Sequence, residues 1–168
     1  MCSSDLGGPL ATEDVTFKVV EAFERHEGRY TIPVSHLHGS DGFGCDLLSV
    51  ASEAVRDKAM TAKSISDAEI ERFIEVKGRS TRTGEVELPG NEFGAAQRLR
   101  HRYWLYRVFI HPLRASYYEI ALLSDPLNSN AVRTATRFDM AQGSGASWYS
   151  MTETVEESSN GTSTPRET

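Results

Sequence analysis

The sequence has few cysteines and no long apolar segment. Its 168 residues include two cysteines, Cys2 and Cys45, which are too few for a disulfide framework and do not have the spacing of a zinc site. We therefore expect a reducing, cytoplasmic setting. No run of about 18 apolar residues occurs, and the first residues lack the apolar segment of a secretory signal, so we expect no membrane span.

Basic residues are outnumbered by acidic ones over the whole chain, 18 against 24, but they gather in one part of it. The formal net charge is −6, which argues against a protein coated with phosphate-binding residues. Between Lys77 and Arg107, however, seven basic residues stand against three acidic ones, a local charge of +4. Residues 152–168 carry four acidic residues and one basic residue, a charge of −3. Because a phosphate ligand responds to the local potential, the basic segment is compatible with nucleic-acid binding.

The composition, 39% hydrophobic and 25% charged residues, is typical of one soluble globular domain. We assign this domain to residues 12–151. Residues 1–11 begin with "MCSSDL", which resembles a translated sequencing adapter. We expect them to be a foreign or disordered segment, with the chain then being the C-terminal piece of a longer protein. Residues 152–168 are rich in Ser, Thr and Glu, which predicts a disordered tail.

Hydrophobic periodicity and turn residues predict the order of the elements. The first helix has Thr12 as its N-cap and Gly28 as its stop. A polar insertion at 52–71 is expected to be partly helical, and a further helix starts near Asn91. Strands are predicted at 30–35, 45–51, 72–78, 83–89, 103–110 and 116–123, with one or two more beyond Asp125. This order predicts an α+β (mixed α/β) fold, in which one central mixed sheet is flanked by helices.

The stretch "RFIEVKG" combines apolar and charged residues in a way that predicts two different faces. Side chains alternate along a strand, so Ile74 and Val76 can enter the core. Phe73, Glu75 and Lys77 then point to the other face, with the carboxylate and the amine roughly 7 Å apart along the strand. Two interpretations are open: a cross-strand ion pair on a solvated face, or part of a functional site.

An aspartate on the preceding predicted strand can join this charged pair. Asp46 follows the turn Gly42–Gly44. If its strand is the neighbour of "RFIEVKG", Asp46 approaches Glu75 and Lys77. Two converging carboxylates repel each other and favour a counter-charge such as Mg²⁺, which binds hard oxygen ligands. The lysine can hold a phosphate oxygen or orient a water. Alternatively, Asp46 caps the glycine-rich turn.

Asp46, Glu75 and Lys77 resemble the motif of the PD-(D/E)XK nuclease superfamily. In that motif an Asp on one strand and a Glu-x-Lys on the next bind magnesium and position a water for phosphodiester cleavage. More closely, "GFGCDLLS", "IEVKG", "NEF" and "YWLYRV" resemble the NO VEIN C-terminal-like domain, a branch found at the ends of helicase-type and restriction or defence proteins. The likeness covers about residues 12–125. The 29 positions from Asp46 to Glu75 exceed the gap in compact versions of the motif, a departure that the insertion explains.

The resemblance implies a restriction-endonuclease-like core and a nuclease that uses Mg²⁺ or Mn²⁺ on DNA. It also implies a defence or DNA-processing system with a helicase or another upstream domain. Asp46 and Glu75 would bind the metal, and Lys77 would stabilise the transition state or tune the attacking water. An acid on the first helix often completes such sites. Of Glu21 and Glu24, we favour Glu24 because it lies nearer the apolar face, with a surface role as the alternative for both.

Four arginines are candidate nucleic-acid contacts. Arg79 and Arg82 follow the charged strand, and Arg98 and Arg102 are four residues apart on one face of the predicted helix. These side chains could bind a nucleic-acid backbone or form an ordinary solvated basic face. Glu92 suits the first turn of the same helix, where a carboxylate interacts favourably with the helix dipole, and a role near the substrate or metal is the alternative.

Two further functions remain open beside the nuclease. Members of such families can keep the fold and lose catalysis, so the first alternative is a catalytically inactive DNA-binding or protein-docking module. The second is a purely structural interaction domain, which predicts that Asp46 and Glu75 do not cluster.

Overall fold

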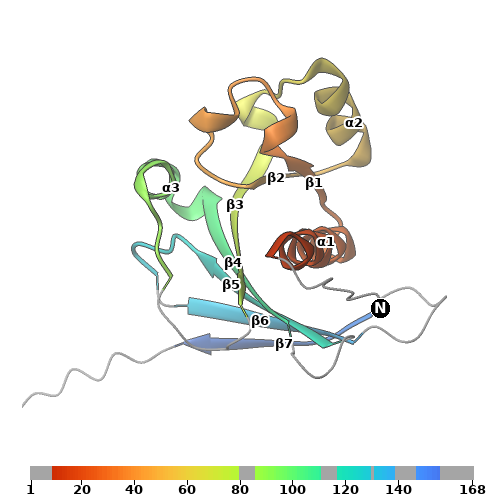
Figure 1. Ribbon diagram of the computed structural model, residues 1–168, viewed down its shortest axis with the longest axis vertical. Coiled ribbons are helices and arrows are strands. Elements are labelled where there is room, and N and C mark those ends of the chain that lie inside the picture. Colours follow the sequence, from red (N-terminus) through yellow and green to blue (C-terminus); the bar gives the residue numbers. More distant parts are fainter. Residues whose placement is uncertain (1–8, 80–85, 111–116, 130, 139–146, 156–168) are drawn as a thin grey trace, which may run out of the picture.

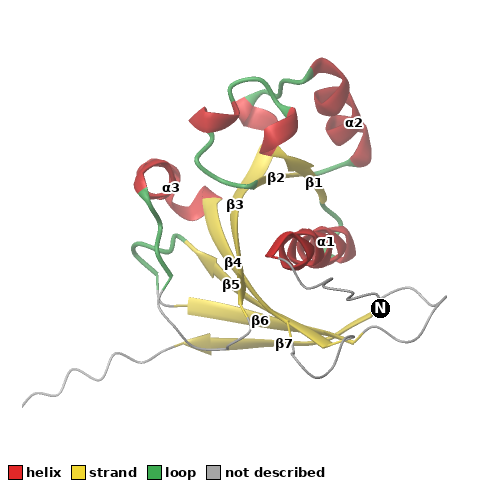
Figure 2. Cartoon of the chain, viewed as in Figure 1, coloured by secondary structure: helices red, strands yellow, loops and turns green. Residues whose placement is uncertain are grey.

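The computed structural model describes residues 9–79, 86–110, 117–129, 131–138 and 147–155. Within them, one mixed sheet has helices on both faces (Figures 1 and 2). The α-helices and strands are α1 (Pro9–His26), β1 (Tyr30–Pro33), β2 (Leu47–Val50), α2 (Glu53–Ala62), β3 (Ile70–Arg79), α3 (Gly90–Leu99), β4 (Tyr103–Ile110), β5 (Tyr117–Ser124), β6 (Ala131–Phe138) and β7 (Ser147–Val155). The predicted α+β class is confirmed, and the layout is consistent with a restriction-endonuclease-like core. No helix in the described ranges combines the length and apolar character needed to cross a membrane.

The strands lie side by side in the order of the sequence, from β1 to β7. Neighbouring strands are antiparallel except for β3 and β4, which are parallel. A parallel pair cannot be joined by a tight turn and needs a crossover connection, and α3 lies in that connection. The crossover brings the start of α3 over the face of β3 that carries the predicted charged pair.

The sheet separates two hydrophobic clusters, and α1 and α3 lie on opposite sides of β3 and β4 (Figure 1). On one face, α1 packs Val20 and Phe23 against Ile74 and other apolar residues of the strands. On the opposite face, Phe73 packs with Ala95 of α3 and with residues of α2. Neighbouring residues of β3 therefore enter different clusters, as the alternation of the sequence predicts.

Three boundaries differ from the sequence-based predictions. Helix α1 begins at Pro9 rather than at Thr12, because proline is well tolerated in the first turn of a helix. Strand β3 starts at Ile70, inside the predicted insertion. Strand β7 continues to Val155, inside the predicted disordered tail. There it pairs antiparallel with β6, and this long-range pairing supplies backbone partners that local composition does not reveal.

The prediction of a strand at 83–89 is wrong for residues 86–89, the part that the structure describes. Residues 86–89 are not in a strand, and residues 83–85 lie outside the described ranges. Strand β3 already has β2 and β4 along its two edges, so no edge of β3 is left for a further strand. In the insertion, α2 confirms the expected helical part, and Ser66 and Glu69 form a capping box on a short 3-10 turn.

Candidate active site

The residue before β2 is tied directly to β3. The backbone N–H of Asp46 donates to the carbonyl oxygen of Ile74 at 3.0 Å. In return, the N–H of Val76 donates to Asp46 Oδ2 at 2.8 Å. These two bonds hold the Asp46 carboxylate beside Glu75, which lies between the two bonded residues of β3. Strands β2 and β3 are neighbours, which is the condition that the site hypothesis required.

Glu75 and Lys77 share the face of β3 that α3 covers. Lys77 Nζ lies 2.5 Å from Glu75 Oε1. The Glu75 side chain is 2% exposed and that of Lys77 is 24% exposed. The pair is therefore not the solvated ion pair that the sequence allowed, because its carboxylate is buried and only the lysine reaches solvent.

Glu92 of α3 completes the group. Its Oε2 atom lies 3.1 Å from Lys77 Nζ, so one ammonium bridges Glu75 and Glu92. Glu92 does lie in the first turn of its helix, as expected. The sequence favoured an interaction with the helix dipole for Glu92, and a role near the substrate or metal was the alternative. The sequence did hold a signal for this position of Glu92. The residues "NEF" stand at the start of the helix that connects β3 to β4, and this connection has to pass over the face of β3.

The glycine-rich turn sets the distance between Asp46 and α3. Gly44 has φ +63°, and a Cβ atom at this position would lie 2.5 Å from the Asn91 carbonyl oxygen and 2.7 Å from Ala95 Cβ. The carbonyl oxygen of Gly44 accepts a hydrogen bond from the Tyr103 hydroxyl at 2.9 Å. The turn therefore packs backbone to backbone against the start of α3, which only glycine permits.

Replacing Gly44 with alanine is expected to destabilise the protein more than the same change at Gly28. Both residues have positive φ, but nothing lies within 4 Å of a Cβ atom at Gly28, so Gly28→Ala carries only the conformational cost. Overpacking adds about 1–3 kcal/mol at Gly44. Urea denaturation of the two variants measures this difference, and equal free energies of unfolding would show that α3 does not rest on the turn.

Burial controls the ionisation of the site. Burial and the neighbouring Asp46 carboxylate raise the pKa of Glu75 to about 8, against the opposing effect of Lys77. Burial also raises the pKa of Asp46, although the Val76 N–H and Lys77 oppose this. Burial would lower the pKa of Lys77, but its hydrogen bonds to Glu75 and Glu92 outweigh burial and raise it. Glu75 therefore ionises less readily than a free glutamate, while Lys77 stays charged at neutral pH.

A pocket of about 290 Å³ opens beside these residues. Asp46, Glu75 and Glu92 line it together with Asn91 and with residues of the turns before β2. Glu75 Oε2 is buried, and no hydrogen-bond donor of the described residues reaches it. A buried carboxylate oxygen without a donor is costly, so this atom is the one best placed to bind something that is not part of the described chain.

Two hard oxygen ligands at this pocket fit a divalent cation such as Mg²⁺ or Mn²⁺. Asp46 and Glu75 would hold it, and the Glu75 Oε2 atom, which no donor of the described residues reaches, supports this assignment. In the described residues, no group of three or more His, Cys, Asp or Glu side chains is arranged to hold a metal ion. Water or phosphate oxygens would therefore complete the coordination, which is common for Mg²⁺.

The structure does not bring Glu24 to this site. Glu24 is fully buried on the α1 face of the sheet, opposite the face that carries Glu75. Its carboxylate accepts two hydrogen bonds from Arg29, at 2.7 and 3.1 Å, and one each from Ser49 and Tyr106 at 2.5 Å. Burial would raise the pKa of Glu24, but Arg29 and these hydrogen bonds lower it. With its oxygens engaged in this way, Glu24 holds α1 on the sheet.

The other acid considered on the first helix lies nearer to Asp46. Glu21 lines a second pocket of about 340 Å³ together with Asp46, Thr31 and Pro33. Its side chain is 48% exposed, and its ion pair with Arg25 is long, at 3.8 Å. Asp46 thus lies between two pockets, and Glu21 rather than Glu24 is the helix acid that shares one of them.

Three of the four arginines predicted to bind nucleic acid are described, and each lies on a different part of the fold. Arg102 donates to Asp67 and to the Ile70 carbonyl oxygen, so it fastens the start of β3, away from Glu75. Arg98 is exposed on α3, and Arg79 is exposed at the end of β3. Arg82 lies outside the described residues.

Comparison with known proteins gives one match. A family model described as "Protein NO VEIN, C-terminal" matches residues 12–120, which is more than half of the chain and includes Asp46, Glu75, Lys77 and Glu92. No curated protein and no solved structure matches.

Proposed function

Because this chain belongs to the NO VEIN C-terminal family, we propose that it is a metal-dependent nuclease domain of the PD-(D/E)XK type that acts on DNA. The observation that carries the proposal is the convergence of Asp46 and Glu75 at one open pocket, with Lys77 in contact with Glu75. Convergence of carboxylates is electrostatically unfavourable and is expected where a cation and a phosphate bind.

Each residue has a distinct role in this mechanism. Asp46 and Glu75 would hold Mg²⁺ or Mn²⁺, which supplies Lewis-acid stabilisation of the phosphate and a more acidic water. Lys77 donates to a phosphate oxygen and stabilises the charge that develops as the phosphodiester bond breaks. Glu92 accepts from Lys77 and holds the ammonium beside Glu75, whose Oε2 atom is left for the metal.

The DNA substrate and its context are also part of the proposal. The local excess of basic residues between Lys77 and Arg107 supports a polyanionic substrate. We further propose that the domain works in a defence or DNA-processing system, in which a helicase-type partner would deliver the DNA strand.

Incubation of the protein with supercoiled plasmid and Mg²⁺ or Mn²⁺ is expected to yield nicked circles. EDTA is expected to stop the reaction, because the carboxylate pair can stabilise the phosphate only through a cation. Gel electrophoresis over a time course measures the rate. A plasmid that stays supercoiled with both metals would refute the nuclease proposal.

Metal titration by calorimetry tests the site independently of activity. The pKa of Glu75 is raised to about 8 and a metal ion requires the ionised carboxylate, so binding should tighten as the pH rises from 6 to about 8. Glu75→Gln should abolish the heat, and Glu69→Gln, at an exposed glutamate that pairs with Lys58, should not change it. Binding that is insensitive to pH would contradict the assignment of Glu75.

A catalytically inactive DNA-binding or docking module is the second candidate. The observation that favours it is the ion-pair bridge itself, because Lys77 is already compensated by Glu75 and Glu92. Intact DNA binding with no Mg²⁺ or Mn²⁺ heat would establish this alternative.

A further inference from the structure

A second pocket adjoins Asp46 on the opposite face of the sheet from Glu75. It is the pocket of about 340 Å³ that Glu21 also lines, and we call it the α1 pocket. In the pairing of β1 with β2, Pro33 is opposite Leu47, and Leu47 packs with residues of α1. Because paired residues point to the same face of a sheet, the α1 pocket lies on the face that α1 covers.

The α1 pocket meets the candidate site at three residues. Val34, Ser35 and Asp46 line both pockets, and they stand just after β1 and just before β2. In the proposed nuclease, a metal at Asp46 and Glu75 holds the cleaved phosphate at this meeting point. The nucleoside next to that phosphate can therefore reach the α1 pocket.

The polar side chains of the α1 pocket are carboxylates and hydroxyls. Glu21 and Asp46 are the charged residues among the described ones that line it, and Thr31 and Ser35 add hydroxyls. The two carboxylates repel a phosphate group that lacks a metal ion. A ligand of this pocket therefore has to offer hydrogen-bond donors rather than further phosphate oxygens.

Glu21 is free to accept a hydrogen bond from such a ligand. Its nearest cation is Arg25, at 3.8 Å, which is too long for a hydrogen bond. Both side chains of this ion pair are about half exposed, at 48% for Glu21 and 59% for Arg25, so the pair is weak. The hydroxyl of Thr31 is also available, because Thr31 is 6% exposed and its side chain has no hydrogen bond to the described residues.

The remaining lining of the α1 pocket is apolar. It consists of Phe17, Pro33, Val34 and Leu47. A nucleobase has a flat apolar face and a polar edge, so apolar walls suit its face and the carboxylate of Glu21 suits a donor on its edge. The volume of about 340 Å³ lies within the range of small-molecule sites.

We propose that the α1 pocket holds the nucleobase next to the cleaved phosphate and that Glu21 selects a base with an exocyclic amino group. This inference rests on the proposed nuclease function and specifies its sequence preference. Adenine, cytosine and guanine carry an amino group, whereas thymine has a carbonyl oxygen where cytosine has its amino group. The Glu21 carboxylate accepts from the amino group and repels the carbonyl oxygen. The base leaves the stack to enter the pocket.

The test maps the bases beside each cut that the protein makes in plasmid with Mg²⁺. Sequencing of the nicked strands counts each base at each position, relative to the composition of the plasmid. At one position next to the cut, thymine should occur about tenfold less often than cytosine, the discrimination typical of one base contact. Glu21→Gln places an amide that donates as well as accepts, so it should bring the two bases to within about twofold of each other.

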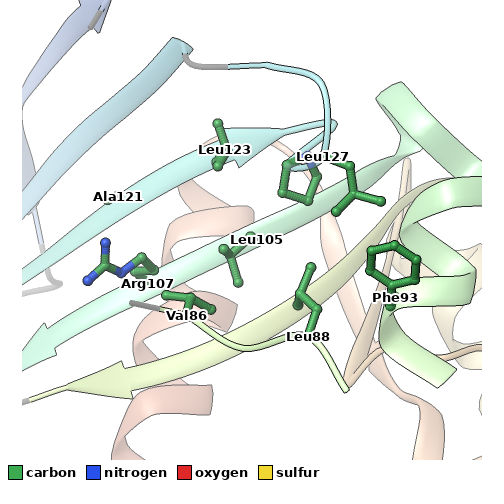
Figure 3. A pocket seen from close by; sticks show the side chains of 9 residues that line it. Val86, Leu88, Phe93, Leu105, Arg107, Ala121, Leu123 and Leu127 are labelled. Atoms are coloured by element: carbon green, nitrogen blue, oxygen red, sulfur yellow. The ribbon is translucent and has the colours of Figure 1, made fainter. Parts of the chain in front are cut away.

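Two control variants should keep the preference of the wild type. Glu53→Gln makes the same change of charge at an exposed glutamate of α2 that pairs with Arg56. Phe93→Leu alters a different hollow of about 410 Å³ over β4 and β5, in which Phe93 lies at one end and Leu105 in the floor (Figure 3). That hollow lies beside Lys77, because Lys77 is paired with Arg107 of its lining, but it shares no lining residue with the α1 pocket.

Each other outcome counts against the inference. Cuts without any base preference, or a preference that Glu21→Gln leaves intact, would overturn the role of Glu21 and leave the nuclease function standing. If Glu21→Gln slows nicking equally beside every base, Glu21 binds a cation and not a base. A preference that Phe93→Leu abolishes would place the base in the other hollow. A protein that does not nick DNA would overturn both proposals.

Discussion

Replacing Lys77 with alanine is expected to slow plasmid nicking by about 100-fold, the loss typical of removing one donor that stabilises a transition state. Lys77 is the cation of the candidate site, with its ammonium 2.5 Å from Glu75 and 3.1 Å from Glu92. Without it, two carboxylates face the scissile phosphate with no protein donor between them. Initial rates of nicking at saturating Mg²⁺ measure the effect.

Two matched variants make this result specific. Lys58→Ala removes an exposed lysine of α2 that pairs with Glu69, and it should leave the rate unchanged. Lys77→Arg keeps the charge but replaces a compact ammonium with a planar fork, so its rate should fall between those of the wild type and the alanine variant. If Lys77→Ala nicks as fast as the wild type, Lys77 has no part in the reaction.

Replacing Glu24 with alanine is expected to lower the free energy of unfolding by about 3–5 kcal/mol. The carboxylate is fully buried and accepts from Arg29, Ser49 and Tyr106, with Arg72 a further 3.4 Å contact. Its removal leaves the guanidinium groups of Arg29 and Arg72 without this shared carboxylate. Both side chains are largely buried, with 14% of Arg29 and 15% of Arg72 exposed. Urea denaturation at pH 7 measures the loss.

The control for Glu24 lies one turn earlier on the same helix. Glu21 is 48% exposed and its ion pair with Arg25 is 3.8 Å long, so Glu21→Ala should change the free energy of unfolding by less than about 0.5 kcal/mol. Because the pKa of Glu24 is lowered in the folded protein, its stabilisation is present above the pKa of the unfolded chain. It should be lost as the pH falls through the lower folded value. A small effect of Glu24→Ala at pH 7 would show that the network is not needed for stability.

The charged strand was predictable because its information is local. The alternation of side chains along β3 places Ile74 on one face and Phe73, Glu75 and Lys77 on the other, independently of the rest of the fold. In the structure, Ile74 and Phe73 do lie in different hydrophobic clusters. The approach of Asp46 to Glu75 needed one assumption, that the strands are neighbours, and the antiparallel pair of β2 and β3 satisfies it.

The role of Glu24 was harder to predict, because the periodicity of a helix identifies its buried side but not the face of the sheet on which that side packs. The periodicity of α1 correctly indicated that Glu24 points toward the core. It could not indicate which face of the sheet α1 would cover. The same limit applies to Arg102, which follows α3 but turns back to Asp67 and the Ile70 carbonyl.

The sequence by itself determined the two-sided character of β3, the central sheet flanked by helices, and the two-strand origin of the Asp46, Glu75 and Lys77 group. Periodicity and turn chemistry act between residues close in the chain, so they can be read without coordinates. Only the tertiary structure decided that Glu92 joins the site, that Glu24 is fastened on the opposite face, and that Phe93 and Leu105 form a hollow beside Lys77. These relations depend on the β3–α3–β4 crossover and on which side of the sheet each helix packs. Both choices are set by the burial of apolar surface over the whole fold rather than by any local pattern.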